Sequence, residues 1–293
     1  MNQIHQNIKQ YPIGIYLGSL LLLSIAPYVL MYQAGDAESE LATFLLMWVP
    51  AIAAILHKLF ARQPLLKNVG WNPIKSVKWL AIAMLVPLLI SISVVGLQVA
   101  FGFAEYNTSF LTLQDGLVSI KGVAMIFGAS PQPIALFIGN FLLSFFVGNL
   151  IYMVAFALGE EYGWRGHLQP LVLQKYAIKQ AFVVLGIIWG LWHLPAILLG
   201  HNYPEYPLLG GFVLMPITCI AFSVAFGIAY LKAKSLWVPV MFHSALNLAA
   251  GMDDKMITTK TNVVGADLVW TVMWITVALV LYFSTSTILK NER

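Results

Sequence analysis

The side chains best suited to chemistry in this sequence form one short cluster, Gly159-Glu160-Glu161-Tyr162-Gly163-Trp164-Arg165. The cluster follows an apolar stretch, and two carboxylates at the end of such a stretch are costly unless other groups neutralise or use them. Neighbouring helical residues are rotated by about 100°, so the two glutamates face different directions. Glu161 and Arg165 are four residues apart and share a face, which favours an internal ion pair. Glu160 is therefore left to act on something else.

Two more polar sites interrupt apolar stretches further along the chain. His193 lies in Gly190-Leu191-Trp192-His193-Leu194-Pro195, and His243 precedes Asn247 by four residues, so that both project from one helix face. Ionisable groups inside a membrane are rare and usually face the protein interior or a water-filled cavity, so each is a candidate functional residue. For each residue taken singly, the alternative is a histidine satisfied in the core or a structural Glu–Arg pair.

Hydrolysis of an amide is the chemistry that this set of side chains supports. It requires a base that activates water, a group that holds the water, and donors for the oxyanion. In this hypothesis Glu160 is the general base. The supporting residues are His193 for the water, His243 and Asn247 for the oxyanion, and Glu161 with Arg165 for orientation of the base.

A metal-bound version of the same site stays open from the residues alone. Glu160, His193 and His243 together provide the two-histidine, one-glutamate ligand set of a catalytic zinc site. They come from separate stretches of the chain, however, and no HExxH motif is present. A zinc site and a site without a cofactor therefore both stay open at this point.

Composition shows what kind of structure must position these groups. Hydrophobic side chains make up 60% of the 293 residues, charged ones 10%, and the mean hydropathy is +0.82. A typical soluble domain is about 45–50% apolar and about 25% charged, so the chain is expected to be a polytopic all-α membrane protein. The net charge of +4 is spread in short clusters rather than in a basic stripe, which argues against nucleic acid as a partner.

Apolar stretches long enough to cross the bilayer, which takes about 20 residues, predict a bundle of about eight transmembrane helices. They lie near 12–32, 41–60, 77–101, 133–160, 181–200, 211–231, 236–251 and 267–289. The connection over 102–132 is long and mixed, and is interpreted as a re-entrant or interfacial segment. Residues 1–293 are expected to form a single integral membrane domain, whose motif-bearing core is at about 133–251.

The basic residues predict the orientation of this bundle. With a cytoplasmic N-terminus, thirteen of the sixteen lysines and arginines fall in inside segments, and only Lys121, Lys255 and Lys260 fall outside. This distribution satisfies the positive-inside rule for eight helices with both termini in the cytoplasm.

Depth can be estimated from the same orientation. At 1.5 Å per residue, His193 lies ~18 Å and His243 ~10 Å below the cytoplasmic surface. Glu160 lies ~15 Å from that surface if Pro170 ends its helix. The three side chains can therefore meet, in a site expected to open toward the cytoplasmic half. His167 shares the Glu160 face and is a candidate for the entrance or simply an interfacial histidine.

The motifs resemble those of the CAAX-protease and bacteriocin-processing (CPBP, or Abi) family of intramembrane proteases. Glu160 to Arg165 is similar to the family's EExxxR motif, Trp189 to His193 falls where the family has FxxxH, and His243 to Asn247 matches HxxxN. Trp189 departs from the usual phenylalanine, an exchange expected to keep the packing while reshaping the pocket. The resemblance covers about 90 residues, from 159 to 247. It implies peptide cleavage by a glutamate-dependent enzyme, with the same division of roles, in a bacterial cell membrane. The resemblance therefore favours a site without a cofactor, and zinc is the alternative.

Other functions compete with this interpretation. A non-enzymatic binding or immunity protein, or a transporter, could use the same buried groups, although the chain has no inverted repeat that would favour transport. The expected partners are the lipid bilayer and a peptide or membrane-protein substrate. A prenylated C-terminal tail is one substrate that the resemblance implies, but nothing in the residues specifies a prenyl group.

Overall fold

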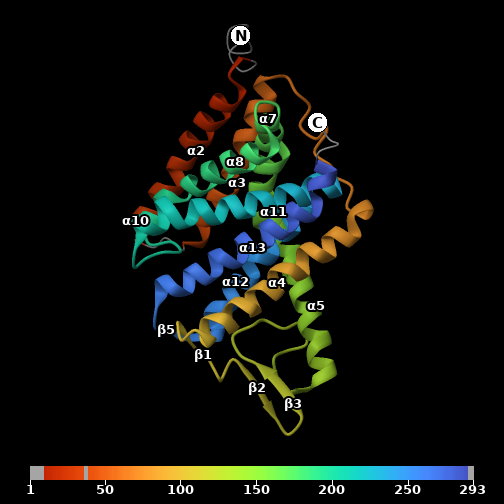
Figure 1. Cartoon of the computed structure of the whole chain (residues 1–293), viewed down its shortest axis with the longest axis vertical. Helices are drawn as coiled ribbons and strands as arrows, with labels where there is room; N and C mark the ends of the chain where they lie inside the picture. The colour runs from red at the N-terminus through yellow and green to blue at the C-terminus, as the bar shows by residue number, and fades with distance from the viewer. Residues whose placement is uncertain (1–9, 36–38, 290–293) are drawn as a thin grey trace.

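The computed structural model describes residues 10–35 and 39–289, and helices dominate it (Figure 1). The helices are α2 (Pro12–Ala34), α3 (Glu40–Phe60), η1 (Ile74–Ser76), α4 (Val77–Ala100), α5 (Ile134–Tyr152), η2 (Met153–Ala157), α6 (Leu158–Gly163), η3 (Trp164–Leu168), α7 (Gln169–Leu173), α8 (Ile178–Trp192), α9 (Leu194–Leu198), α10 (Pro207–Leu209), η4 (Gly210–Leu214), α11 (Met215–Ala233), α12 (Trp237–Met256) and α13 (Val263–Leu289). The predicted cytoplasmic termini include residues 1–9 and 290–293, which lie outside the described residues.

Within the described residues, seven helical segments are long and apolar enough to cross a membrane. They are Pro12–Ala34, Glu40–Phe60, Val77–Ala100, Ile134–Leu173, Ile178–Leu198, Pro207–Ala233 and Val263–Thr285. The eighth predicted span, 236–251, coincides with helix α12 but is not among the seven, because α12 carries His243, Asn247 and two aspartates. The chain is thus an all-α polytopic membrane protein in which the least apolar long helix carries candidate site residues.

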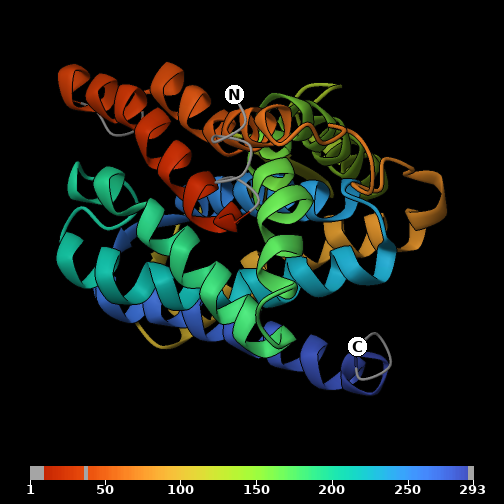
Figure 2. The ribbon, with the colours of Figure 1, turned by 90° about the horizontal axis from the view of Figure 1, so that it is seen from above.

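One helix, Ile134–Leu173, runs through the molecule and carries both glutamates. Two π-helical turns, η2 and η3, lie immediately before and after α6, and such widened turns are frequent at functional sites. In Figure 2 this green segment stands between the red α2 and the cyan-to-blue helices. The prediction that Pro170 ends the helix is wrong: Pro170 lies in the first turn of α7, directly after a π turn, where its missing N–H is tolerated.

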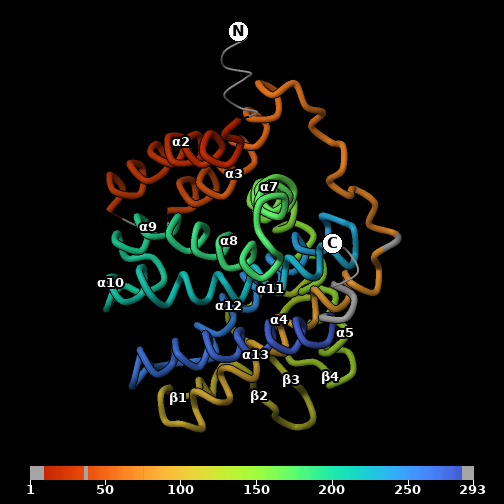
Figure 3. Tube along the Cα trace, turned by 45° about the horizontal axis from the view of Figure 1, so that its top comes forward, coloured from red at the N-terminus to blue at the C-terminus, as the bar shows by residue number. Residues whose placement is uncertain are grey.

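Pairs of glycines bring the site-bearing helices close to their neighbours. A Cβ on Gly163 would lie 2.4 Å from the Pro50 carbonyl carbon on α3, and a Cβ on Gly159 would lie 2.6 Å from the Met47 oxygen. Gly186 and Gly190 repeat the four-residue spacing on α8, where a Cβ on Gly190 would lie 2.4 Å from Pro216 on α11. Figure 3 shows α8 and α11 running alongside each other. Small residues at this spacing allow close backbone packing in membranes.

Gly163→Ala is expected to destabilise the protein by about 1–3 kcal/mol, the usual cost of overpacking, because the new methyl group would overlap the backbone at Pro50. Thermal unfolding of the purified protein in detergent measures the effect. Gly139→Ala is the matched control on the same helix, since nothing lies within 4 Å of its Cβ position. Equal melting temperatures for the two variants would contradict the close packing of α6 on α3.

The 102–132 connection, predicted to be a re-entrant or interfacial segment, contains short β-strands. The strands are β1 (Ala104–Tyr106), β2 (Leu111–Gln114), β3 (Leu117–Ile120), β4 (Gln132–Pro133) and, after α12, β5 (Ile257–Lys260). β2, β3 and β4 make one antiparallel sheet, while β1 pairs with β5. The β1–β5 pair ties the end of α4 to the end of α12, so it helps to hold the helix that carries His243.

Candidate active site

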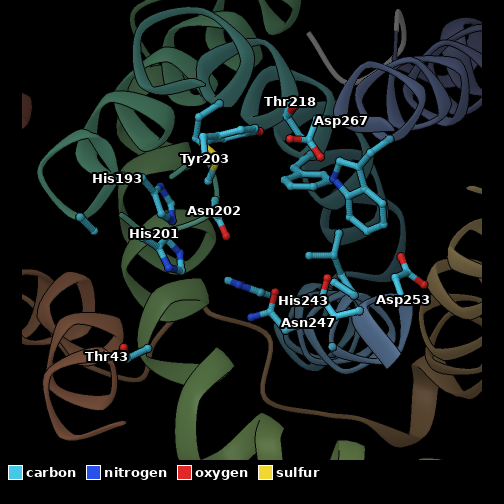
Figure 4. Close-up of a pocket in the computed structure, with 18 of the residues that line it drawn as sticks. Thr43, His193, His201, Asn202, Tyr203, Thr218, His243, Asn247, Asp253 and Asp267 are labelled. Carbon is cyan, nitrogen blue, oxygen red and sulfur yellow. The ribbon is translucent and has the colours of Figure 1, made fainter. Parts of the chain in front are cut away.

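The structure brings four of the six predicted site residues to one cavity of about 790 Å³. Glu160 comes from α6, His193 from the junction of α8 and α9, and both His243 and Asn247 from α12. Figure 4 shows the two histidines and the asparagine around the cavity. Glu161 and Arg165 are fully buried behind it and do not line it.

Glu160 is held by two indole groups. Its carboxylate oxygen Oε2 accepts hydrogen bonds from Trp164 Nε1 at 3.1 Å and from Trp189 Nε1 at 2.9 Å. Only 3% of the residue is exposed. Both bonds fall on one oxygen, so the carboxylate is fixed in orientation while the residue still lines the cavity.

The sequence did not reveal these indole donors. Trp189 was expected to replace the family's phenylalanine as a packing residue only, yet the indole N–H adds a bond that phenylalanine cannot make. Trp164 lies four residues after Glu160, and this spacing was the available signal, because residues four apart on a helix are neighbours.

Glu161 joins the other two motifs. Its Oε1 accepts a hydrogen bond from Arg165 Nη1 at 2.7 Å and one from His243 Nδ1 at 2.8 Å. The predicted ion pair with Arg165 is therefore confirmed, and the bond to His243 links α6 to α12. The Arg165 guanidinium also lies over the rings of Trp189, at 4.4 Å, and Phe226, at 4.9 Å. Packing and charge together fix the groups beneath the cavity.

His193 and Asn247 are oriented by neighbours on their own side of the cavity. His193 Nδ1 lies 2.8 Å from the Trp189 carbonyl oxygen. A carbonyl can only accept, so Nδ1 carries the hydrogen and Nε2 is left with a lone pair in the neutral ring. Pro195 follows at the start of α9. Asn247 Nδ2 donates to the Tyr152 hydroxyl at 3.1 Å, which leaves its second amide hydrogen for another acceptor.

Trp189→Phe is expected to lower the rate of the reaction at this site by about tenfold, the effect of one lost hydrogen bond to a charged group. The remaining Trp164 bond would hold Glu160 less firmly. The measurement is the rate at saturating substrate, with the melting temperature recorded beside it. Trp237→Phe is the matched control, because it removes an indole bond to the Trp71 carbonyl and touches no residue of the site. Equal rates for both variants would mean that the Trp189 bond does not position Glu160.

The cavity extends away from the end of the molecule where α7 stops. Its lining includes Thr43 near the start of α3, Gln98 near the end of α4, Asn202 after α9, Asp253 near the end of α12, and Asp267 near the start of α13. In the orientation predicted from the basic residues, these helix ends are outside the cell. The cavity was predicted to open toward the cytoplasmic half. That opening stays a prediction, and these lining residues do not favour it.

The mouth of the cavity is polar. Asp267 accepts a hydrogen bond from the Tyr206 hydroxyl and lies 3.5 Å from Lys260 Nζ. Burial, reinforced by the nearby Asp267 carboxylate, raises the pKa of Tyr203 in the loop before α10. The Tyr203 hydroxyl therefore keeps its proton at neutral pH and can donate a hydrogen bond to a molecule that enters.

Comparisons with known proteins identify the family. Residues 140–249, which contain all six predicted site residues, match the family described as Rce1-like, Type II CAAX prenyl endopeptidase Rce1-like. One relative is a CAAX prenyl protease 2 from Methanococcus maripaludis, 26% identical over 170 residues, which are 49% of this chain and 62% of the relative. Another is a lysostaphin resistance protein A from Staphylococcus haemolyticus, 21% identical over 292 residues, covering 94% of this chain and 69% of the relative. These matches support a CPBP family protein.

The two relatives match different shares of this chain. The chain spans less than two thirds of the length of the Methanococcus protein that it matches. The match to the Staphylococcus protein, in contrast, extends across nearly the whole chain. The family match therefore rests on the motif-bearing region, and the sequence around it is matched by the second relative.

Whether this site binds zinc stays a prediction. Among the described residues, no three histidine, cysteine, aspartate or glutamate side chains are grouped as metal ligands require. Glu160 Oε2 instead accepts two indole hydrogens, and the carboxylate bound to His243 is that of Glu161. No catalytic step is therefore assigned to a metal.

The direction of the cavity can be tested by cysteine labelling. Cys219 is fully buried, so the unmodified chain is expected to resist a membrane-impermeant maleimide. In the orientation predicted from the basic residues, Asn202→Cys is labelled in intact cells, and Gln174→Cys at the α7 end only after the membrane is opened. The reverse pattern would place the cavity mouth in the cytoplasm.

Proposed function

We propose that this protein is an intramembrane endopeptidase that hydrolyses a peptide bond with water activated by Glu160. The observation that carries the proposal is the buried Glu160 carboxylate, fixed by two indole N–H groups at the wall of a cavity shared with His193, His243 and Asn247. A base, a water-holding group and two oxyanion donors at one cavity are the requirements of amide hydrolysis.

In the first step, a water held by His193 Nε2 attacks the peptide carbonyl carbon. Glu160 accepts the proton that the water loses, and the hydroxyl forms the new C–O bond while the carbonyl π electrons move to oxygen. The indole bonds limit rotation of the carboxylate, so the base is already oriented before substrate arrives.

The tetrahedral oxyanion is stabilised from α12. His243 donates from Nε2 as an imidazolium, whose Nδ1–H is held by Glu161, and Asn247 donates from its free amide hydrogen. The C–N bond then breaks, and the proton on Glu160 passes to the leaving amine.

The proposed substrate is a peptide segment at the membrane. A cavity of about 790 Å³ with a polar mouth has room for a few residues of extended chain. The Methanococcus relative is named for CAAX prenyl proteolysis, and a prenylated C-terminal tail is one substrate within this class. The proposed location is the bacterial cell membrane, as the family resemblance implies.

Mass spectrometry of membrane-associated peptides tests the proposal. Membranes that contain the wild-type chain are compared with membranes that contain Glu160→Gln at equal amounts, and peptides that end at a new terminus only with the wild type identify the cleavage site. Identical peptide sets would contradict the proposal. Metal analysis of the same purified protein is expected to find no zinc bound in proportion to the chain, and zinc lost together with activity in His193→Ala would overturn the metal-free mechanism.

A non-enzymatic role is the second candidate. The match to a protein named for lysostaphin resistance covers 94% of this chain, more than the match to the named protease. In this case the cavity binds a peptide or a partner without cleaving it. A cellular phenotype that depends on the chain but survives Glu160→Gln and His243→Ala would favour this role, and loss of the phenotype in both variants would favour the peptidase.

A further inference from the structure

A second cavity, of about 550 Å³, lies at the opposite end of the bundle from the mouth of the first. It is formed by the start of α2, the end of α3, the segment after α3, and the region from η3 to the end of α7. Its lining residues are Pro12, His57, Lys58, Ala61, Gln63, Pro64, Lys67, Asn68, Gly166, His167, Pro170, Leu171 and Gln174. We propose that this cavity binds a phosphate group, carried by a phospholipid headgroup or present as inorganic phosphate.

The charge of the lining selects an anion. Two lysines and two histidines line the cavity, and none of its lining residues is an aspartate or glutamate. Lys58 is 94% buried, since only 6% of it is exposed. Its Nζ donates to the Leu65 carbonyl at 3.2 Å and to the Tyr162 hydroxyl at 3.3 Å. Both acceptors are neutral, so the Lys58 charge is held in place without being compensated, which is costly at this depth unless an anion binds.

The histidines contribute buried nitrogens that have no hydrogen-bond partner among the described residues. His57 is 3% exposed, and neither of its ring nitrogens has a hydrogen-bond partner among the described residues. His167 is 4% exposed, and its Nε2 likewise has none in the same part of the chain. Buried polar groups of native proteins are normally satisfied. A phosphate oxygen would accept a hydrogen bond from either ring, even when the ring is neutral.

The surrounding packing keeps the two rings together. Their centroids are 4.7 Å apart, and the Tyr16 ring contacts His167 edge-on at 5.1 Å. The Pro12 carbonyl is close to His57 without forming a hydrogen bond of good geometry. The cluster is therefore preorganised rather than assembled by the ligand.

These positions differ from the sequence-based expectation. His167 was a candidate for the entrance to the Glu160 cavity, but it lines the second cavity and not the first. The π-helical turn η3, Trp164–Leu168, follows Glu160, contains His167 and shifts the helical register, so His167 does not face the same cavity as Glu160.

The surface around the second cavity suits a phospholipid as well as free phosphate. Large apolar side chains near the cavity are exposed, including Tyr11 at 60%, Leu59 at 55% and Leu66 at 66%. In a membrane these side chains would contact acyl chains, while the lysines face the headgroup region. A metal ion fits less well, because no third histidine, cysteine or carboxylate joins the two histidines among the described residues.

Native mass spectrometry of the purified full chain tests the proposal. The chain is freed of lipid and then titrated with phosphatidylglycerol, phosphatidylcholine, diacylglycerol or sodium phosphate. Phosphatidylglycerol is expected to bind at one site with an affinity at least tenfold above that of diacylglycerol, which lacks phosphate. Displacement of the lipid by millimolar sodium phosphate would assign the site to free phosphate, whereas lipid that resists phosphate assigns it to the headgroup. Equal binding of phosphatidylglycerol and diacylglycerol, or no binding of any phosphate compound, overturns the proposal.

Variants show whether this cavity is the site. His57→Phe keeps a ring of similar size while removing both nitrogens, and Lys67→Met removes an exposed charge that no described residue pairs. Each is expected to weaken phosphatidylglycerol binding by about tenfold, the effect of one charge-assisted hydrogen bond. Lys121→Met, an exposed lysine outside both cavities, is expected to change nothing. If His57→Phe does not fold, Lys67→Met decides: unchanged binding in that variant contradicts the proposal.

Discussion

Glu160→Gln is expected to reduce the rate of peptide cleavage by about a thousandfold or more, the usual contribution of a general base. Glutamine has nearly the same shape, and its amide oxygen can still accept the Trp164 and Trp189 hydrogens. It cannot take a proton from water near neutral pH. The measurement is single-turnover cleavage, in proteoliposomes, of a peptide that wild-type membranes release.

The matched control for this change is Glu205→Gln. Glu205 undergoes the same chemical substitution, but it is exposed in the loop before α10 and does not line the cavity. Its cleavage rate is expected to stay within twofold of the wild type. If Glu160→Gln retained more than about a tenth of the activity, Glu160 would not be the general base, because loss of such a base costs at least about a hundredfold.

Arg165→Met is expected to destabilise the protein by about 3–5 kcal/mol, because removing one partner of a buried ion pair leaves the other charge buried without compensation. Arg165 and Glu161 are both fully buried, so the Glu161 carboxylate would keep only His243 as a partner. The stacking of the guanidinium on Trp189 and Phe226 would be lost as well. Reversible unfolding in mixed detergent and SDS micelles measures the change.

The double variant Glu161→Gln with Arg165→Met separates charge from packing. Because it removes both charges, its loss of unfolding free energy is expected to be smaller than the sum of the losses in the two single variants. Arg165→Lys keeps a positive charge but not the planar group that stacks on the rings, so it is expected to be intermediate. Strict additivity of the two single changes would mean that the Arg165–Glu161 pair is not energetically coupled.

Much of the fold follows from the sequence because hydrophobic length is a strong signal. Seven of the predicted spans correspond to helical segments apolar enough to cross the bilayer. The span at 236–251 is a helix, but one too polar to meet the same criterion, since His243, Asn247 and the aspartates after them lower its apolar content. The strands between α4 and α5 were not predicted, because short strands in a mixed segment lack a clear alternation of apolar and polar residues.

Some contacts of the candidate site follow from the sequence, and others do not. Helical spacing correctly paired Glu161 with Arg165, and the estimated depths placed Glu160, His193 and His243 at compatible levels. The hydrogen bond between His243 and Glu161 joins residues 82 positions apart, so no local sequence pattern indicates it. The π-helical turns also escaped prediction, because tertiary packing rather than local propensity decides where a helix widens.

The hairpin of β2 and β3 offers a practical way to image so small a membrane protein. Its turn is formed by Asp115 and Gly116, which both have positive φ angles of 51° and 75°, and its strands pair only with each other and with β4. The hairpin lies at the lower end of the molecule in Figure 1, apart from most of the helices. Exposed tight turns tolerate inserted domains because their flanking strands already hold the ends together. A rigid soluble domain fused between these two residues would project beyond the detergent micelle and provide an alignment feature for electron microscopy of this 32.4-kDa chain.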